Sequence, residues 1–383
     1  MRVLFISDVY FPRVNGVSTS IRTFRQDLSA AGVRTLLVAP HYEGADGAAD
    51  GAHVLRIPAS GVPGDPEDRR MAWGALKRQL ASLPRGEFDL VHIHTPFIAH
   101  YAGVRFARAN NIPCVATYHT FFEEYLHHYV PLLPRVLGRQ LARGVTRSQC
   151  AAVNALVAPS QPMRAMLTDY GVRTPIAVIP TGLPASSFKP GDGARFRAQQ
   201  QLPSNRPLLL YVGRVAHEKN IDFLLTSFVE VKRARPDALL VIAGEGPARK
   251  HLGEQVQRLG LGRDVAFVGY LDREQALADC YAAASVFVFA SRTETQGLVL
   301  LEALAQGCPV VSTSHLGTAS ILQPNCGARV APEDPAAFAA AATGILDDPQ
   351  RAAQLGMQGR SYAHTWSSES MAGRMREFYS GLR

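Results

Sequence analysis

Cysteine is scarce in this sequence, and it is dispersed. The five thiols belong to Cys114, Cys150, Cys280, Cys308 and Cys326. No two of them stand at the spacing of a zinc site, and an odd number of scattered cysteines does not make a disulfide framework. We therefore expect a protein of a reducing compartment, the cytoplasm.

Long hydrophobic runs are also missing. No segment approaches the ~18 consecutive apolar residues with which a helix crosses a bilayer. The N-terminal stretch of residues 1–12 is apolar, but it is short and Asp8 interrupts it. We expect a buried first strand there, not a signal peptide.

A third absence concerns dinucleotide chemistry. Residues 7–16, which follow that first strand, are SDVYFPRVNG and contain no G-x-G-x-x-G. A Rossmann oxidoreductase needs this glycine pattern for its cofactor, so we set that class aside. A two-lobed, non-catalytic sugar-binding protein is a further alternative, although such a protein would normally carry a secretory signal.

Positive charge is abundant, mainly in one half of the chain. The 383 residues hold 40 Lys and Arg against 32 Asp and Glu, a net charge of +8. Residues 1–190 carry 20 of these cations and 13 of these acids, which is +7. This excess indicates an anionic partner for the N-terminal half. An arginine-rich composition without functional meaning is the alternative.

The chain is too long for one ordinary core and suits two domains. Short aliphatic segments alternate with helical patterns, which predicts βαβ units and parallel sheets. The strands expected in the first half are 2–7, 34–40, 53–58, 90–94, 113–119, 155–160 and 176–182, and its helices 18–31, 69–83, 99–110, 133–153 and 161–170. Those expected in the second half are strands 207–214, 238–246, 265–270, 286–291, 309–314 and 327–332.

Residues 180–193 are rich in Pro, Gly and Ser and mark a linker. We expect two Rossmann-like domains facing each other across a cleft, with boundaries at 1–185 and 186–366. In open α/β sheets the ligand lies beyond the carboxyl ends of the strands. Functional side chains are therefore expected directly after strands.

Two strand ends of the N-terminal domain carry polar signals. After the first strand, Asn15 and Gly16 predict a turn, and a glycine there lets a phosphate approach the N–H groups of the next helix. We expect Ser18 or Thr19 to cap that helix. His119 ends a later strand, where a neutral imidazole can hydrogen-bond a sugar hydroxyl or stabilise developing charge. A structural turn and a packing histidine are the alternatives.

Two cations follow the first strand of the C-terminal domain. Arg214 and Lys219 flank the turn that leads into an amphipathic helix. Such a pair suits a diphosphate. A solvated loop is the alternative interpretation.

Two acidic residues surround a glycine turn further on. Glu294 lies in the loop before Gly297, and Glu302 lies on the second turn of a helix expected at 298–306. A buried carboxylate is costly unless it is paired or hydrogen-bonded. A phosphate at the helix N-terminus, with carboxylates accepting from hydroxyls on both sides, satisfies this requirement. A nucleotide sugar has that shape, while a cap or an ion pair is the structural alternative for either glutamate alone.

Together these segments resemble the retaining GT-B glycosyltransferases of family GT4. The segments GRVAHEKN, AGEGP, FVGYL and TETQGLVLLEALAQGCPVV carry the resemblance, which covers nearly the whole chain. Glu294 and Glu302 meet the family's E-x7-E pattern. With Gln296 where many members have Phe, the last segment is similar to diacylglycerol α-glucosyltransferases, and GDP-mannose-dependent α-mannosyltransferases are close relatives.

The resemblance implies a role for each matching residue. Arg214 and Lys219 would bind the donor diphosphate. Glu302 would bind the ribose hydroxyls, and Glu294 the transferred sugar. His119 would hydrogen-bond that sugar near the reacting carbon. Further donor contacts would come from Gly16, Gly269, Tyr270, Thr295, Gln296, Gly297 and Leu298. The last helix, within 367–383, would cross back to the N-terminal domain.

The resemblance also implies a chemistry. In this family, retention of the anomeric configuration is usually attributed to attack by the acceptor on the face of the sugar from which the leaving group departs. The departing diphosphate would help to remove the proton of the acceptor. Arg214 and Lys219 would stabilise the departing charge. The sequence contains no D-x-D motif. We therefore expect catalysis without a metal ion or another cofactor, with a UDP-sugar or GDP-mannose as the donor substrate.

We expect the acceptor to bind the basic N-terminal half. Trp73, Leu76, Leu80 and Leu83 stand at helical spacing among basic residues, including Arg69 and Arg70. Four arginines recur every fourth residue on a second helix, at 135, 139, 143 and 147. Basic amphipathic helices bind anionic membranes. An ordinary helix with solvated charges is the alternative.

We therefore predict a retaining hexosyltransferase that uses a nucleotide sugar, UDP-glucose by preference, and a membrane lipid such as diacylglycerol. It would be peripheral on the inner face of the cell membrane and would bind no nucleic acid. The alternatives are a GDP-mannose-dependent α-mannosyltransferase and a soluble transferase that builds a polysaccharide or small glycoside.

Overall fold

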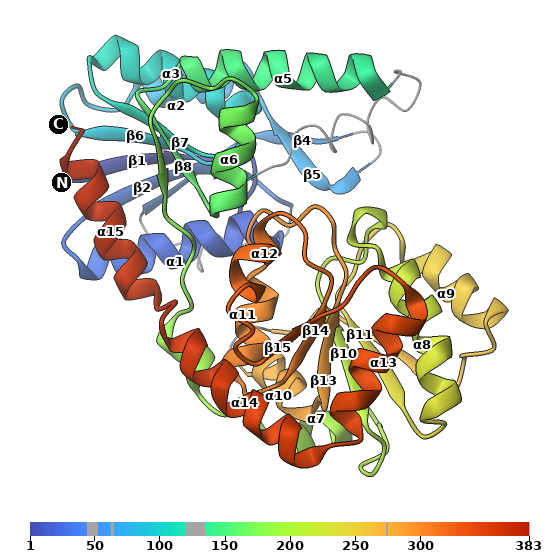
Figure 1. The fold of residues 1–383 in the computed structure, drawn as a ribbon. Helices are drawn as coiled ribbons and strands as arrows, with labels where there is room; N and C mark the ends of the chain where they lie inside the picture. Colours follow the sequence, from blue (N-terminus) through green and yellow to red (C-terminus); the bar gives the residue numbers. More distant parts are fainter. Residues whose placement is uncertain (44–52, 63–64, 120–134, 273–274, 383) are drawn as a thin grey trace. The chain divides into compact units, whose positions relative to one another are not determined.

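The computed structural model describes residues 1–43, 53–62, 65–119, 135–272 and 275–382. The chain divides into two compact units (Figure 1). The N-terminal unit comprises Met1–Gly182 together with the C-terminal segment Ser368–Arg383, and the C-terminal unit comprises Leu183–Ser367.

The N-terminal unit is built on a seven-stranded sheet with the order β3-β2-β1-β6-β7-β8-β9. Every neighbouring pair in it is parallel, as the alternation of strands and helices predicts. Its strands are β1 Arg2–Ile6, β2 Arg34–Pro40, β3 Val54–Ile57, β6 Leu90–Ile93, β7 Cys114–Thr117, β8 Ala155–Ala158 and β9 Ile176–Val178.

Side chains of β1 alternate between two hydrophobic cores, because successive strand residues point to opposite faces of a sheet. Val3 and Phe5 join the core formed with α1 and α15, whereas Leu4 and Ile6 join the core formed with α2, α3 and α6. The helices of this unit are α1 Gly16–Ala30, α2 Trp73–Ala81, α3 Ile98–Asn110, α5 Arg135–Ala151, α6 Gln161–Asp169 and α15 Ser368–Ser380. The last helix therefore belongs to the N-terminal unit, where it packs against α1.

The C-terminal unit has a six-stranded sheet, also parallel throughout, with the order β12-β11-β10-β13-β14-β15. Its strands are β10 Leu208–Val212, β11 Leu239–Ala243, β12 Val265–Gly269, β13 Val286–Phe289, β14 Val310–Ser312 and β15 Ala328–Val330. All residues of β10, β11 and β13 are buried, so the unit encloses one continuous core.

Helices cover both faces of this sheet (Figure 1). They are α7 Gly193–Gln199, α8 Ile221–Ala234, α9 Arg249–Arg258, α10 Ala276–Ala283, α11 Leu298–Ala305, α12 Gly317–Leu322, α13 Pro335–Leu346 and α14 Pro349–His364. Two short 3₁₀ turns, η3 Ala185–Phe188 and η4 His217–Lys219, complete the unit.

One secondary-structure prediction is wrong. The helix expected at 69–83 begins only at Trp73, because residues before it form an antiparallel hairpin of β4 (Ala59–Val62) and β5 (Asp65–Met71). Arg69 and Arg70 therefore lie on a strand, and Arg69 stacks over the ring of Tyr42. The helical spacing of apolar residues starts only with Trp73. Backbone pairing in the hairpin determines the conformation of the residues before it.

Two further observations complete the fold. All five cysteines are free, as their spacing indicates, and Cys326 alone is partly exposed. Among the residues that the structure describes, no helix combines the length and the apolar character needed to cross a membrane.

Candidate functional site

Each sheet contains one point at which the strand order reverses, and polar groups gather at both. In the C-terminal sheet, β11 and β12 lie on one side of β10, while β13, β14 and β15 lie on the other. In the N-terminal sheet the corresponding point lies between β1 and β6. Open α/β sheets bind ligands outside the carboxyl ends of strands at such points.

Lys219 and Glu294 meet at the reversal point of the C-terminal sheet. Lys219 ends the turn η4 after β10, and Glu294 lies in the loop after β13. The Lys219 Nζ donates to Glu294 Oε1 at 2.5 Å, with the two side chains 17% and 22% exposed. Because an ammonium has three donors, Lys219 can hold this carboxylate and a phosphate oxygen together.

Arg214 lies in the same loop after β10. Its guanidinium is 3.7 Å from the carboxylate of Glu218, and its backbone carbonyl accepts from the hydroxyl of Tyr211. Burial raises the pKa of Tyr211 well above its usual range, and the charges of Glu294 and Glu218 raise it further. Tyr211 is thus a neutral hydrogen-bond donor that fixes the start of the loop.

Glycines allow two loops to lie against each other beside Arg214. A Cβ on Gly244 would lie 1.9 Å from the carbonyl oxygen of Gly213, and one on Gly246 would lie 2.4 Å from that of Val215. Both glycines also adopt positive φ angles, 134° and 156°. The A-G-E-G segment is therefore a packing requirement that brings the loops after β10 and β11 together.

The loop that carries Glu294 is held by α12. The backbone N–H of Gly317 donates to the Glu294 carbonyl at 2.9 Å. A Cβ on Gly317 would lie 2.1 Å from the carbonyl oxygen of Thr295, so that helix approaches the loop as closely as glycine permits. Gln296 is buried, whereas Thr295 and Leu298 are half-buried. Gly297 has φ 92° and is the N-terminal cap residue of α11, which leaves helix N–H groups at this loop.

Glu302 is buried on α11, as the spacing predicts. It is 6% exposed, and its Oε2 accepts a hydrogen bond from the hydroxyl of Tyr281 at 3.0 Å. That contact offsets part of the cost of burying the carboxylate. Tyr281 is not among the predicted site residues, because a tyrosine inside an apolar helix carries no separate signal.

Gly269 is the last residue of β12, and Tyr270 follows it. The carbonyl of Gly269 accepts from the N–H of Gly244 at 2.8 Å, which connects this strand end to the glycine loop after β11. The ring of Tyr270 is half exposed. The two residues therefore lie at the carboxyl edge of the sheet, two strands away from β10.

A second anchor of η4 was also missed. Asn220, the residue after Lys219, adopts a left-handed conformation with φ 57° and donates to Glu333 Oε1 at 3.0 Å. Glu333 also pairs with Arg292, and this hydrogen bond is the main cause that lowers the pKa of Glu333. Asn220 and Glu333 are over a hundred positions apart in sequence, so no local pattern indicates their contact.

Asp8 occupies the reversal point of the N-terminal sheet. Its carboxylate accepts from Thr95 Oγ1 at 2.7 Å and from the backbone N–H of Ala99 at 3.1 Å, at the start of α3. Burial raises the pKa of Asp8 to about 6 in spite of these hydrogen bonds. In the sequence Asp8 only interrupts an apolar run, so this network has no local signal.

His119 lies two residues beyond the end of β7, close to its predicted place at the end of a strand. Its Nε2 is 3.4 Å from His94 Nδ1, and the two rings stack with centroids 5.7 Å apart. Burial lowers the pKa of His119 to about 4, so its ring is neutral at pH 7. In the described part of the chain, the buried Nε2 of His94 has no hydrogen-bond partner.

A deeper histidine connects this cluster to the C-terminal helix. His92 makes two short contacts, of Nδ1 with the Tyr379 hydroxyl at 2.5 Å and of Nε2 with Thr117 Oγ1 at 2.6 Å. Its ring stands 4.2 Å from that of His94. Burial lowers the pKa of His92 to about 3. The helix α15 thus contacts the strands whose ends carry His94 and His119.

Gly16 begins α1, but the cap of that helix differs from the prediction. Asn15 is the N-terminal cap, and its side chain accepts from the N–H of Ser18 at 2.8 Å. Ser18 and Thr19 are buried inside the helix instead. A Cβ on Gly16 would meet no atom within 4 Å, so packing within the described residues does not require glycine there.

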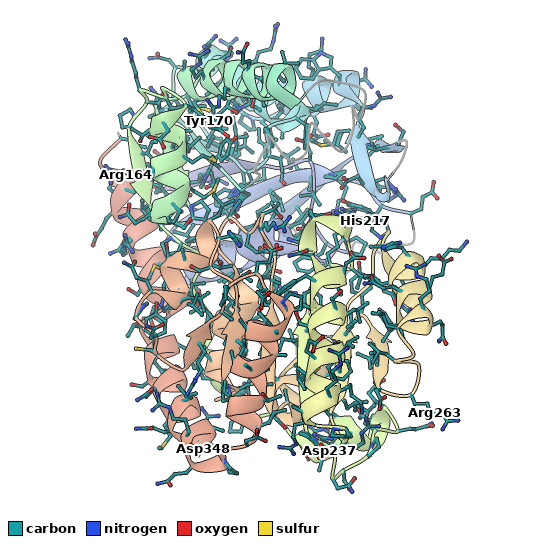
Figure 2. All side chains as sticks on the ribbon, turned by 45° about the vertical axis from the view of Figure 1, so that its right-hand side comes forward. Arg164, Tyr170, His217, Asp237, Arg263 and Asp348 are labelled. Atoms are coloured by element: carbon teal, nitrogen blue, oxygen red, sulfur yellow. The ribbon has the colours of Figure 1, made fainter. Side chains whose placement is uncertain are left out.

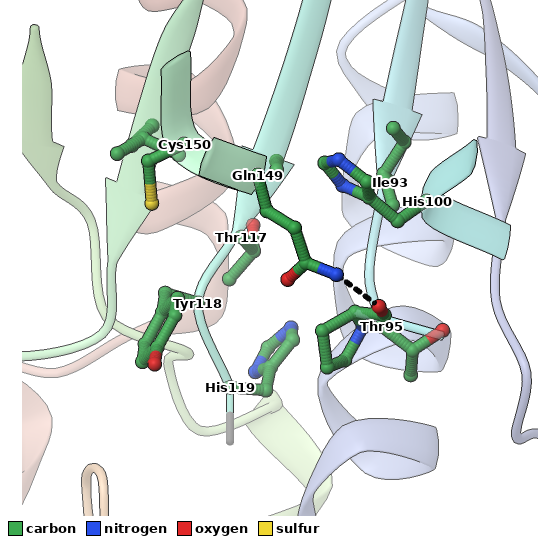
Figure 3. Close-up of a pocket in the computed structure, with 11 residues that line it drawn as sticks. Ile93, Thr95, His100, Thr117, Tyr118, His119, Gln149 and Cys150 are labelled. Carbon is green, nitrogen blue, oxygen red and sulfur yellow. Dashed lines mark hydrogen bonds between the residues drawn. The ribbon is translucent and has the colours of Figure 1, made fainter. Parts of the chain in front are cut away.

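A small cavity opens beside His119 within the N-terminal unit (Figure 3). It measures about 30 Å³, and His100, Tyr118 and Gln149 are among its lining residues. The amide of Gln149 donates across it to the carbonyl of Pro96 at 2.7 Å. A cavity of this size accommodates about one water molecule, so it is not itself a sugar site.

The basic helix of the predicted acceptor surface forms as α5. Arg147 is exposed on it, and the guanidinium of Arg143 stacks over the ring of Tyr170 at 4.8 Å. The side chains of Arg135 and Arg139 lie outside the described part of the structure. On α2, Leu76 and Leu80 are buried, whereas Trp73 is 39% exposed.

The depressed pKa of His92 predicts a pH-dependent stability. An unfolded histidine binds a proton near pH ~6.5, whereas the folded His92 does so only near pH 3. The contribution of His92 to the unfolding free energy is therefore fully present above the pKa of the unfolded histidine. It declines as the pH falls below that value. His92→Gln should reduce the slope of the unfolding free energy between pH 6 and 4 by about 1.4 kcal/mol per pH unit.

Urea unfolding at several pH values measures this slope. His41→Gln, at an exposed position of the same unit, is the control and should leave it close to that of the wild type. An unchanged slope in His92→Gln would show that His92 titrates normally in the folded protein.

Two family models match adjacent parts of the chain. The model described as Glycosyltransferase Family 4 covers residues 14–187, and the model described as Glycosyl transferases group 1 covers residues 192–362. Together they include every strand of both sheets except β1.

Individual relatives agree with these models. An alpha-monoglucosyldiacylglycerol synthase of Streptococcus pneumoniae is 33% identical over 320 residues, 82% of this chain and 71% of the relative. A GDP-mannose-dependent alpha-(1-6)-phosphatidylinositol dimannoside mannosyltransferase of Mycobacterium tuberculosis is 28% identical over 374 residues, 96% of this chain and 93% of the relative. Among solved structures, a sucrose-phosphate synthase of Thermosynechococcus elongatus superposes with a TM-score of 0.83 and 25% identity, over 100% of this chain and 98% of the other.

Proposed function

The chain belongs to glycosyltransferase family 4 and has the GT-B fold, and we propose that it moves a hexose from a nucleotide sugar to a membrane lipid with retention of the anomeric configuration. Family and fold confirm the resemblance stated from the sequence. UDP-glucose is the favoured donor and diacylglycerol the favoured acceptor. The 33% identity to a glucosyldiacylglycerol synthase supports this choice.

The contact of Lys219 with Glu294 is the observation that carries the proposal. It places a cation and a carboxylate side by side at the strand-order reversal, next to the N-terminus of α11. In the proposed complex, Lys219 and Arg214 bind the diphosphate and the carboxylate of Glu294 accepts from a hydroxyl of the sugar. Glu302 accepts from the ribose hydroxyls on the other side.

In the reaction, the bond between the anomeric carbon and the diphosphate oxygen breaks. The acceptor oxygen forms its bond to that carbon from the same face, and its proton passes to the departing diphosphate. Lys219 and Arg214 stabilise the negative charge that develops, which is an interaction strongest in the transition state. The neutral ring of His119 hydrogen-bonds the sugar near the reacting carbon.

A release assay over four donors tests the proposal. Purified protein is mixed with diacylglycerol vesicles and with UDP-glucose, UDP-galactose, UDP-N-acetylglucosamine or GDP-mannose. The proposal expects UDP release from UDP-glucose together with a glucosylated lipid. Turnover of GDP-mannose alone would favour the mannosyltransferase alternative, which the 96% coverage by the mycobacterial enzyme supports. Release from no donor would contradict both.

Glu294→Gln tests the carboxylate. The amide keeps the size of the side chain and still accepts from Lys219, but it loses the charge that stabilises the transition state. We expect turnover to fall by about 10²–10³-fold while the dissociation constant of UDP changes little. Glu230→Gln, at a carboxylate of α8 paired with Arg233, is the control. Wild-type turnover in Glu294→Gln would refute the role of Glu294.

Lys219→Ala tests the cation. The substitution removes one positive charge that would bind the diphosphate, and it leaves Glu294 without this partner. We expect UDP affinity and turnover each to fall at least about tenfold, as for a charge-assisted hydrogen bond. Lys232→Ala is a matched control, because that lysine has the same 17% exposure and pairs with Asp264. Calorimetry that finds equal UDP affinity in Lys219→Ala and wild type would count against the proposed site.

Metal-independent turnover is a further expectation, since two cations face the diphosphate in the proposed complex. Excess EDTA should leave the rate unchanged at saturating donor. Loss of activity that Mg²⁺ or Mn²⁺ restores would contradict this expectation.

The membrane surface is tested by sedimentation with vesicles that contain anionic lipid, at low salt. Arg143→Glu together with Arg147→Glu should reduce the bound fraction, because both charges lie on α5 and would then repel the surface. Arg233→Glu, 70% exposed on α8, is the control for a charge change elsewhere. Wild-type protein that stays in the supernatant would favour a soluble acceptor.

A further inference from the structure

We propose that the C-terminal unit binds a divalent transition metal ion, Zn²⁺ by chemical preference, between His217, Asp222 and His251. The site is separate from the residues assigned to the donor and to catalysis. The ion would act as a cross-link between three segments of the fold and would take no part in the transfer reaction.

The three side chains converge from three elements. His217 comes from η4, Asp222 from the first turn of α8 and His251 from the first turn of α9. One ligand atom of each lies within 4.8 Å of the other two. His251 Nε2 is 2.7 Å from Asp222 Oδ1, and the rings of His217 and His251 are 5.5 Å apart. Figure 2 labels His217 close to the end of α8.

The donor set selects the class of metal. Two imidazoles and one carboxylate suit zinc and its neighbours in the first transition row, whereas Mg²⁺ and Ca²⁺ prefer oxygen ligands. In a tetrahedral zinc site with bonds of about 2.0–2.2 Å, ligand atoms lie about 3.3 Å apart. Rotation of exposed side chains covers the difference from the observed spacing, and a fourth position remains for water.

The backbone beneath the site is already fixed. Gln255 of α9 donates to the backbone carbonyl of Asp222 at 3.3 Å, which holds the two helices together. The backbone N–H of Asn220 donates to the carbonyl of His217, which closes the turn η4. Metal binding therefore orders only side chains. The N-terminal dipoles of α8 and α9 disfavour a cation, so we expect micromolar affinity and not a permanently bound ion.

The position of the ion gives it a regulatory use, which rests on the proposed function. His217 and Lys219 belong to the same three-residue turn. Lys219 contacts Glu294 after β13, on one side of β10, whereas His217 faces α9, which follows β11 on the other side. An ion at His217 would add positive charge to the turn from which Lys219 reaches the diphosphate.

Titration calorimetry with Zn²⁺ tests the site, and Co²⁺ absorption spectra report its ligands. We expect one ion per wild-type chain. His217→Ala, Asp222→Asn and His251→Ala should each weaken binding at least tenfold, and thermal unfolding should show that the variants remain folded. Zn²⁺ should raise the melting temperature of the wild type and not that of His251→Ala.

Two controls separate this site from other ligands of the chain. Cys326→Ser removes the partly exposed thiol, and a double change of His127 and His128 to Ala removes the adjacent histidine pair of the sequence. Both should bind Zn²⁺ as the wild type does. The proposal would be overturned if His217→Ala and His251→Ala bound Zn²⁺ as tightly as the wild type does. It would also be overturned if the wild type bound no Zn²⁺ at 100 µM (about the upper end of a micromolar site). Either result would show that His251 and Asp222 form only a hydrogen-bonded pair on the surface.

The coupling to the donor site has its own readout. Chains loaded with one equivalent of Zn²⁺ should bind UDP about two- to fivefold more tightly than metal-free chains, because the added positive charge attracts the diphosphate, and His251→Ala should show no difference. Zn²⁺ binding without any effect on UDP would overturn the coupling alone. Failure of every form to bind a nucleoside diphosphate would overturn the proposed function and leave the metal site standing.

Discussion

The ion pair of Lys219 and Glu294 is the interaction on which the C-terminal unit's candidate site depends. The two residues are 75 positions apart, and they meet because β10 and β13 are neighbours at the reversal of strand order. A hydrogen bond between charged groups contributes about 1.5–3 kcal/mol. Much of the surrounding structure fixes the two loops: Asn220 and Glu333 on one side, Gly317 on the other. The pair is thus presented by rigid backbone and not by two flexible chains.

The N-terminal unit follows the same principle with a different chemistry. Asp8 accepts hydrogen bonds at the start of α3, and the rings of three histidines lie against one another along the ends of β6 and β7. Their burial keeps them neutral at pH 7. A neutral ring can donate to or accept from a hydroxyl without adding charge beside an electron-poor carbon. Under the proposed function, the neutral rings of this unit meet the sugar, while the cations of the C-terminal unit meet the diphosphate.

Much of this could be predicted from the sequence, because the signals were local. Aliphatic runs predict both parallel sheets, and Arg214, Lys219, Glu294 and His119 lie after strands as predicted. Their roles stay predictions. The errors arose where tertiary contacts decide. Arg69 and Arg70 are predicted to be helical but lie on β5, because backbone pairing with β4 has no pattern in the sequence. Tyr281, Glu333 and Asp8 were missed because their partners are distant in the chain or because an apolar run concealed them. The cap of α1 shows a smaller error: Asn15, Ser18 and Thr19 are all good cap residues, and only the backbone selects one.

The location of the diphosphate is the most direct test. Crystals soaked with UDP should show both phosphates against Lys219 and Arg214, with the ribose hydroxyls toward Glu302 and the β-phosphate near the N–H groups at Gly297. Lys219 should keep its contact with Glu294 while it donates to a phosphate oxygen. Density for UDP elsewhere, with these side chains unchanged and in contact only with water, would contradict the assignment of the C-terminal unit to the donor.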